Sequence, residues 1–116
     1  MLCVAILALL VGMMIEKELE MDCNLVLDYI KENVKVNDIL ELSYNRVFTP
    51  GEVLNVDTSE YNGKSGLRVM IHVSGDISTS TVEVDLEEVK DELIEVIHIP
   101  KNKNEKITIL IENCEL

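Results

Sequence analysis

The distribution of charge along the chain constrains its fold more than any other feature of the sequence. None of the first 15 residues has a charged side chain, and all 32 Asp, Glu, Lys and Arg residues follow Ile15. The run Leu2–Ile15 is apolar apart from Gly12, but it is shorter than the roughly 17–25 residues that a lone helix needs to cross a bilayer. We therefore expect residues 1–15 to form an apolar helix that anchors in a membrane or packs into a filament core.

Other interpretations of this run remain open at the level of the sequence. A secretory signal peptide has this length, but it begins with basic residues, and no Lys or Arg precedes the run. A leader upstream of Met1 would account for their absence. A helix buried in a soluble core is also possible in principle, although 116 residues leave little room to surround a helix that is apolar on every face.

Residues 16–36 are predicted to continue this helix, because they contain neither Gly nor Pro. Their apolar residues recur at helical spacing and form one stripe, so this half of the helix would be amphipathic: Leu19, Cys23, Val26, Leu27, Ile30 and Val34. A break near Glu16 is the competing interpretation, since Glu16, Glu18 and Glu20 would suit the positive end of a new helix. Residues 1–36 are thus predicted to form an N-terminal helical unit.

After residue 36 the periodicity changes to that of β-strands. Alternating apolar residues predict six strands, over residues 39–48, 52–58, 67–73, 77–86, 93–99 and 107–112. Thr49-Pro50-Gly51 predicts a break, Asn62-Gly63 predicts a tight turn, and residues 87–92 predict either one helical turn or a polar loop. Six such strands without intervening helices predict an antiparallel sandwich over residues 37–116. The expected fold class is therefore α+β, a long hydrophobic-then-amphipathic helix followed by a β-sandwich.

Two features of the sequence carry a resemblance to known families, a set of three stretches and the order of the predicted elements. Val47–Val56 (VFTPGEVLNV), followed by the 67–73 strand and by Ile97-His-Ile-Pro-Lys101, resembles the immunoglobulin-like sandwiches of microbial cell-surface proteins. The order of apolar helix, amphipathic extension and β-sandwich is similar to type IV pilin-like subunits, including archaeal pilins. This resemblance implies a helix that packs into a filament core or lies in the membrane, with the sandwich exposed to solvent.

The cysteines and the small residues of the apolar run are the candidate structural sites. A Cys23–Cys114 disulfide would join the helix to the sandwich, and the alternative is that each is a small buried thiol. Ala5, Ala8 and Gly12 lie on one helical face and would permit close packing of helices from several copies. We therefore predict a homo-oligomer that forms through the N-terminal helix.

No pattern in the sequence predicts catalysis, a cofactor or a bound metal. His72 and His98 lie in different predicted strands without a ligand motif, so we interpret them as hydrogen-bonded strand histidines. Four nearby acidic residues lack the spacing of a calcium loop and are interpreted as a solvated strand end: Glu83, Asp85, Glu87 and Glu88. The protein is therefore expected not to be an enzyme, and no small-molecule ligand is expected.

The net charge of −12 excludes a nucleic-acid partner, because nucleic acids bind to basic surfaces. Two functions follow from the remaining observations. The first is a pilin-like structural subunit at the cell surface, and the second is a membrane-anchored monomeric module that recognises another surface protein through its loops at 61–66, 74–76 and 100–106. Under both hypotheses the protein is membrane-anchored or extracellular, with the sandwich outside the cytoplasm.

Overall fold

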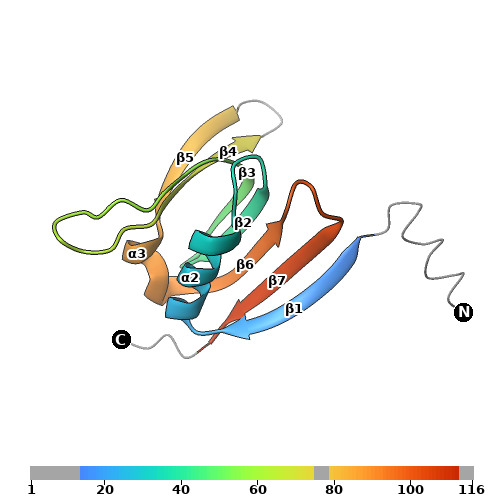
Figure 1. Cartoon of the computed structure of the whole chain (residues 1–116), viewed down its shortest axis with the longest axis horizontal. Coiled ribbons are helices and arrows are strands. Elements are labelled where there is room, and N and C mark those ends of the chain that lie inside the picture. The colour runs from blue at the N-terminus through green and yellow to red at the C-terminus, as the bar shows by residue number, and fades with distance from the viewer. Residues whose placement is uncertain (1–13, 75–78, 113–116) are drawn as a thin grey trace, which may run out of the picture.

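The described residues form a curved β-sheet with a helix packed against one face (Figure 1). The structure is a computed structural model and describes residues 14–74 and 79–112. Within these ranges the sheet has seven strands in the order β1-β7-β6-β2-β3-β4-β5. Neighbouring strands are antiparallel except for β1 and β7, which are parallel.

The bounds of the strands match most of the predicted ones. The strands are β1 (Ile15–Met21), β2 (Ile39–Tyr44), β3 (Val47–Asp57), β4 (Arg68–Ser74), β5 (Thr79–Asp85), β6 (Leu93–Ile99) and β7 (Glu105–Ile111). The helices are α2 (Cys23–Asn33), the short α3 (Leu86–Val89) and the 3-10 turn η1 (Lys90–Glu92). Of the two alternatives predicted for residues 87–92, a helical turn and a polar loop, the structure contains helical turns, α3 and η1.

The chain reverses between β2 and β3 at Asn45 and Arg46, not at the predicted Thr49-Pro50-Gly51 break. Both residues have positive φ, 37° and 67°, and connect Tyr44 directly to its partner Val47. The prediction was wrong because Pro50 and Gly51 lie inside β3. A Cβ on Gly51 would come within 2.1 Å of the His72 carbonyl oxygen, so glycine lets β4 approach closely at this point.

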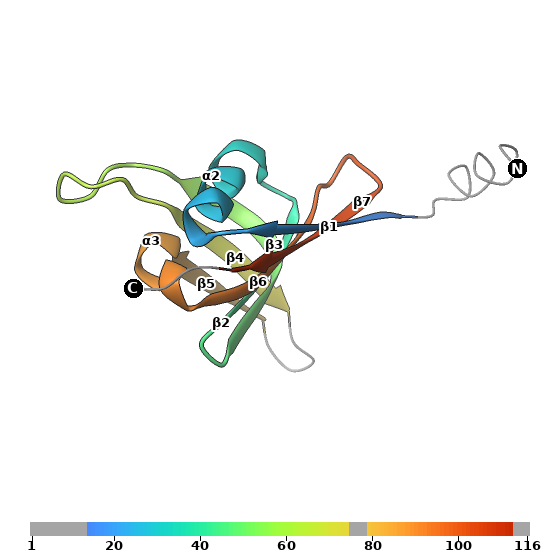
Figure 2. The ribbon, with the colours of Figure 1, turned by 90° about the horizontal axis from the view of Figure 1, so that it is seen from below.

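The long N-terminal helix predicted for residues 1–36 is not present in the described residues, and this part of the fold prediction was wrong. Residues 15–21 form β1, which pairs with β7 in parallel from Ile15–Glu105 to Met21–Ile111 (Figure 2). Glu16, Glu18 and Glu20 recur with a period of two, which places all three on one face of a strand. β1 is therefore a strand of the same sheet, although it precedes residue 37, where the β-sandwich was predicted to begin.

A helix does form further along, over Cys23–Asn33. Asp22 caps its N-terminus by accepting a hydrogen bond from the backbone N–H of Leu25 at 2.9 Å. The predicted apolar stripe is confirmed for this helix and the residue after it, with five members buried: Cys23, Val26, Leu27, Ile30 and Val34. Leu19, the first member of the stripe, is exposed on β1.

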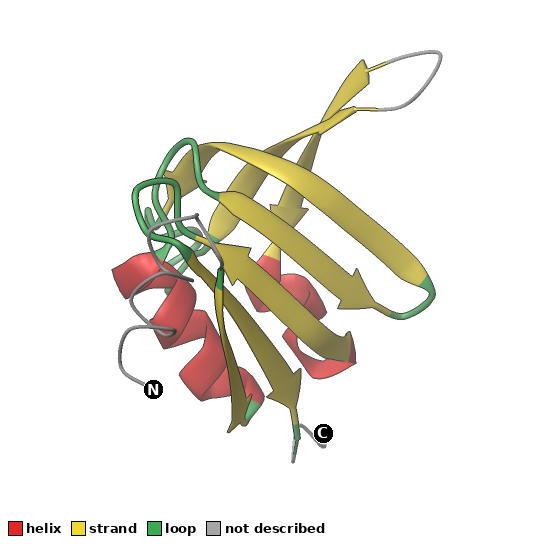
Figure 3. Cartoon of the chain, turned by 90° about the vertical axis from the view of Figure 1, so that its right-hand side faces the viewer, coloured by secondary structure: helices red, strands yellow, loops and turns green. Residues whose placement is uncertain are grey.

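The predicted sandwich is also wrong, because α2 covers the face of the sheet on which a second sheet was expected. Figure 3 shows the helices on one face of the curved sheet. The core between them is made of aliphatic side chains from α2 and from the inward positions of the strands: Val26, Leu27, Ile30, Leu40, Leu42, Val53, Val69, Ile71, Val96 and Ile109 among others. One amphipathic helix thus covers the apolar face of the sheet, which is formed by the alternating apolar residues of the strands.

The predicted membrane-anchored location is contradicted by the helices that the structure contains. In residues 14–74 and 79–112, no helix is long and apolar enough to cross a membrane. Most of the apolar run, residues 1–13, lies outside the described residues.

Candidate functional site

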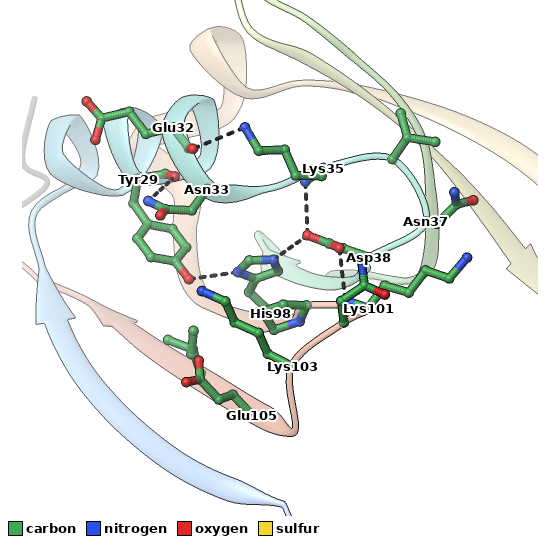
Figure 4. A pocket seen from close by; sticks show the side chains of 14 residues that line it. Tyr29, Glu32, Asn33, Lys35, Asn37, Asp38, His98, Lys101, Lys103 and Glu105 are labelled. Atoms are coloured by element: carbon green, nitrogen blue, oxygen red, sulfur yellow. Dashed lines mark hydrogen bonds and ion pairs between the residues drawn. The ribbon is translucent and has the colours of Figure 1, made fainter.

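A pocket of about 460 Å³ opens at one end of the sheet, between the last turn of α2 and the loop that joins β6 to β7 (Figure 4). Its wall is completed by the linker between α2 and β2 and by the start of β7. The pocket thus brings together two separate stretches of the sequence, residues 29–38 and 98–107.

Sheet register brings the polar side chains of the pocket together. His98 lies near the end of β6 and pairs with Leu40 of β2, so it shares the inward face with Val96 and Leu40. Asp38 directly precedes β2 and therefore lies beside the end of β6. Tyr29 projects from α2 across the same space (Figure 4).

Tyr29, His98 and Asp38 form a continuous chain of hydrogen bonds. The Tyr29 hydroxyl lies 2.7 Å from Nδ1 of His98, and Nε2 of His98 lies 2.7 Å from Oδ2 of Asp38. Only 1% of His98 and 4% of Asp38 is exposed. The Tyr29 and His98 rings meet edge to face at 77°, with centroids 5.6 Å apart, which adds packing to the hydrogen bond.

Asp38 is held as an ionised acceptor. Its Oδ2 also accepts the backbone N–H of Lys35 at 2.9 Å, and its Oδ1 accepts that of Lys101 at 3.0 Å. Burial acts to raise the pKa of Asp38, but the hydrogen bonds from His98, Lys101 and Lys35 outweigh burial and hold the pKa below its ordinary value of 3.8. The carboxylate therefore ties the linker, β6 and the following loop together.

Tyr29 is held as a protonated hydroxyl. Burial, assisted by the negative charges of Glu105 and Asp38, raises the pKa of Tyr29 to about 12. At neutral pH the hydroxyl keeps its proton and can both donate and accept a hydrogen bond.

Three lysines surround this polar floor: Lys35, Lys101 and Lys103. Lys35 donates to the backbone carbonyl of Glu32 at 3.3 Å. Within residues 14–74 and 79–112, no ion pair joins Lys101 or Lys103 to a carboxylate. In Figure 4, Lys103 extends from its loop toward the Tyr29 hydroxyl, whereas Lys101 extends past Asp38 to the outer rim.

Two glutamates complete the wall, Glu32 and Glu105. Glu105 pairs with Lys17 of β1 at 3.3 Å, which neutralises it in part. Burial and the negative charges of Glu105 and Asp38 nevertheless raise the pKa of Tyr29, and Lys103 is the cation that extends toward its hydroxyl.

Comparison with known protein families assigns the chain to one of them. A family model described as an uncharacterized protein conserved in archaea (DUF2097) matches residues 17–110. The chain belongs to this archaeal family. Neither a curated protein nor a solved structure matches it. The archaeal part of the resemblance seen in the sequence is confirmed, whereas nothing supports its pilin-like or immunoglobulin-like part.

The segment that defines the family runs from β1 to β7 and includes every residue of the pocket.

The structure describes one of the two cysteines of the predicted disulfide. Cys23 is buried on α2, with Sγ 4.0 Å from Oδ1 of Asp91, and Cys114 lies outside the described residues. The Cys23–Cys114 bond stays a prediction.

The proposed helix-packing residues Ala5, Ala8 and Gly12 likewise lie outside the described residues. Assembly through them also stays a prediction.

The histidines lie apart from one another, as predicted. His98 is a buried, hydrogen-bonded strand histidine, which confirms the interpretation made for it. His72 lies on β4, where it pairs with Glu52 and Thr81.

The acidic residues near the end of β5 interact with basic neighbours. Asp85 pairs with Arg68 at 3.8 Å, and Glu87 pairs with Lys31 and Lys90 at 3.8 and 3.6 Å. In the part of the chain that the structure describes, no group of three or more His, Cys, Asp or Glu residues could hold a metal ion.

The sequence predicted His98 as a hydrogen-bonded strand histidine, not as part of a pocket, and it did not reveal the partners Tyr29 and Asp38. Tyr29 directly precedes the buried Ile30 but is not part of the predicted apolar stripe. Asp38 follows Asn37, which has a φ of 79°, a conformation typical of a turn. The position of Asp38 directly before a buried strand is the feature of the sequence that could have indicated a buried, hydrogen-bonded carboxylate.

Proposed function

We propose that this protein binds a small organic anion in the pocket between α2 and the β6–β7 loop. The observation that carries the proposal is Lys103, a cation without a carboxylate partner among the described residues, which extends toward the Tyr29 hydroxyl. An anion at this place would meet a positive charge and a hydrogen-bonding group together.

The charge of the whole chain makes this local arrangement specific. The protein has a formal net charge of −12 with only ten Lys and Arg residues, and three of those ten line one pocket. A general attraction for anions is thus ruled out by the acidic surface, so binding must depend on the pocket itself.

The dimensions and the lining suit a small polar ligand. The volume of about 460 Å³ falls within the roughly 300–1,000 Å³ that is usual for small-molecule sites. The lining is rich in Lys, Glu and Asn side chains, which favours a charged ligand over an apolar one. The sequence alone led us to expect no such ligand, because it does not reveal the pocket.

The same contacts favour binding over catalysis. The raised pKa of Tyr29 keeps its hydroxyl protonated at neutral pH, so the hydroxyl is a poor general acid and is not activated as a nucleophile. Both ring nitrogens of His98 are engaged, and the ring is buried beneath Tyr29. The network therefore holds the floor of the pocket in one geometry.

Calorimetric titration of glycerol 3-phosphate and of lactate tests this proposal. Replacing Lys103 by glutamine should weaken the binding of the anions by at least about threefold, because one cation is lost from the site. Lys64→Gln is the matched control, since it removes the same charge from the turn at Tyr61–Lys64. Absence of binding to the wild type, or equal weakening by both variants, would contradict the proposal.

Homo-oligomerisation is the second candidate, and exposed apolar side chains at the β2–β3 end of the sheet favour it. Phe48 is 60% exposed and Ile94 59% exposed, and their strands flank β2 on either side. Sedimentation velocity should show a dimer that Phe48→Ser abolishes. A wild-type chain that sediments as a monomer at high concentration would exclude this assembly.

A further inference from the structure

The pocket presents a hydrogen-bond acceptor, not a donor, at the Tyr29 hydroxyl. We infer that its ligand is an organic anion bearing a hydroxyl or amino group, with the anion at Lys103 and the hydrogen-bond donor at Tyr29. The inference rests on the proposed function, because it specifies what the same pocket selects.

The Asp38 carboxylate forms one buried end of the hydrogen-bond chain. Asp38 accepts from the backbone N–H groups of Lys35 and Lys101, which can only donate. These two contacts and the contact with His98 favour the ionised carboxylate, which is an acceptor on both oxygens. The 2.7 Å contact with Nε2 of His98 therefore requires a proton on Nε2.

The proton on Nε2 fixes the direction of the next hydrogen bond. In a neutral imidazole with a proton on Nε2, Nδ1 carries a lone pair and can only accept. The Tyr29 hydroxyl lies 2.7 Å from this Nδ1, so it must donate its proton to His98. The order holds for the neutral ring of His98, because both backbone donors at the end of the chain are fixed.

Tyr29 has one hydroxyl proton, and His98 uses it. The oxygen therefore offers only lone pairs to the pocket. A ligand hydroxyl or amine can donate to it, whereas an anionic oxygen or a bare ether placed there would leave an acceptor facing an acceptor. Lys103, which extends toward the same hydroxyl, supplies the charge that the anionic part of the ligand needs (Figure 4).

Selectivity between matched ligands measures this arrangement. Glycerol 3-phosphate and propyl phosphate carry the same phosphomonoester and differ in their hydroxyl groups. Lactate and propionate form a second pair with a carboxylate. The wild type should bind the hydroxylated member of each pair more tightly, by about threefold to tenfold, since one hydrogen bond at a half-buried oxygen separates them.

Replacing Tyr29 by phenylalanine removes the acceptor and should reduce this preference to about one. Circular dichroism checks that the variant remains folded. Equal binding of both members of each pair by the wild type would overturn the inference and leave the proposed function standing. Absence of binding to all four compounds would instead remove the proposed function, and the inference with it.

A second measurement needs neither a variant nor a ligand. The ¹⁵N chemical shifts of the His98 ring, read from long-range ¹H–¹⁵N spectra of the wild-type protein, distinguish a proton on Nε2 from one on Nδ1. We expect the neutral ring to carry its proton on Nε2. A proton on Nδ1 would make Tyr29 an acceptor toward His98, free its hydroxyl to donate into the pocket, and overturn the inference.

Discussion

Replacing Asp38 by asparagine should destabilise the protein although it changes only one atom. The Asp38 carboxylate accepts three hydrogen bonds, from the backbone of Lys35, the backbone of Lys101 and the ring of His98. An amide has one oxygen and one NH₂ group, so it cannot accept on both sides. In either orientation of the amide, at least one backbone N–H faces another donor.

The structure sets the size of the effect. Asp38 is only 4% exposed, so water cannot readily replace the lost acceptor. A buried donor left without a partner costs about 1–3 kcal/mol, and hydrogen bonds to a charged acceptor are worth about 1.5–3 kcal/mol each. We expect the free energy of unfolding to fall by about 2–3 kcal/mol, because reorientation of the His98 ring can restore part of the network.

Urea denaturation at pH 7, followed by circular dichroism, measures this change. Asp28→Asn is the matched control, because Asp28 is an exposed carboxylate on α2. The control should change the free energy of unfolding by less than about 0.5 kcal/mol. A loss below about 0.5 kcal/mol for Asp38→Asn would refute the view that this carboxylate ties the site together.

Three further predictions concern the pH dependence of Asp38, the close approach at Gly51 and the helix cap at Asp22. Because the pKa of Asp38 is lowered in the folded state, its ionised form stabilises the fold above the ordinary pKa of 3.8, and this stability is lost as the pH falls through the folded pKa. In acid titrations the wild type should therefore lose stability more steeply than Asp38→Asn, and parallel curves would contradict this. Gly51→Ala should lower the free energy of unfolding by about 1–3 kcal/mol, because its Cβ would overlap the His72 carbonyl; an unchanged urea midpoint would be inconsistent with that close approach. Asp22→Ala should cost about 0.5–2 kcal/mol through the lost helix cap, and Asp22→Asn, which keeps a capping oxygen, should cost less.

The sequence predicted most strands because their alternation is strict. In β4, Val69 and Ile71 are fully buried, whereas Met70 and His72 on the opposite face are half-buried, as a period of two requires. The Asn62-Gly63 turn was also predictable: both residues have positive φ, 53° and 76°, and Tyr61 pairs with Lys64 across them.

The N-terminal segment was predicted wrongly because two periodicities overlap in it. Leu19 and Cys23 are four residues apart, so they fit the helical stripe of α2, while Glu16, Glu18 and Glu20 alternate as in a strand. The strand forms because β7 offers an edge along Glu105–Ile111 for β1 to pair with. Local sequence does not contain that edge, which comes from residues almost at the other end of the chain.

The pocket was beyond sequence reasoning for a similar reason. Tyr29 and His98 are 69 residues apart, and Asp38 and His98 are 60 apart. Only the register of β2 with β6 and the packing of α2 on the sheet bring them together. The alternative hypothesis of a binding module named residues 100–106 as one of three loops that recognise another protein. Five residues of that loop line the pocket: Pro100, Lys101, Asn102, Lys103 and Glu105.

The most direct test of the central claim is to locate the ligand on the protein. In ¹H–¹⁵N spectra of the wild-type chain titrated with glycerol 3-phosphate, the backbone amides of Lys35, Lys101 and Lys103 should shift together and saturate. The amides of the Tyr61–Lys64 turn should stay in place. Absence of saturable shifts at the three pocket lysines, or shifts of equal size around Lys64, would contradict the assignment of this pocket as the binding site.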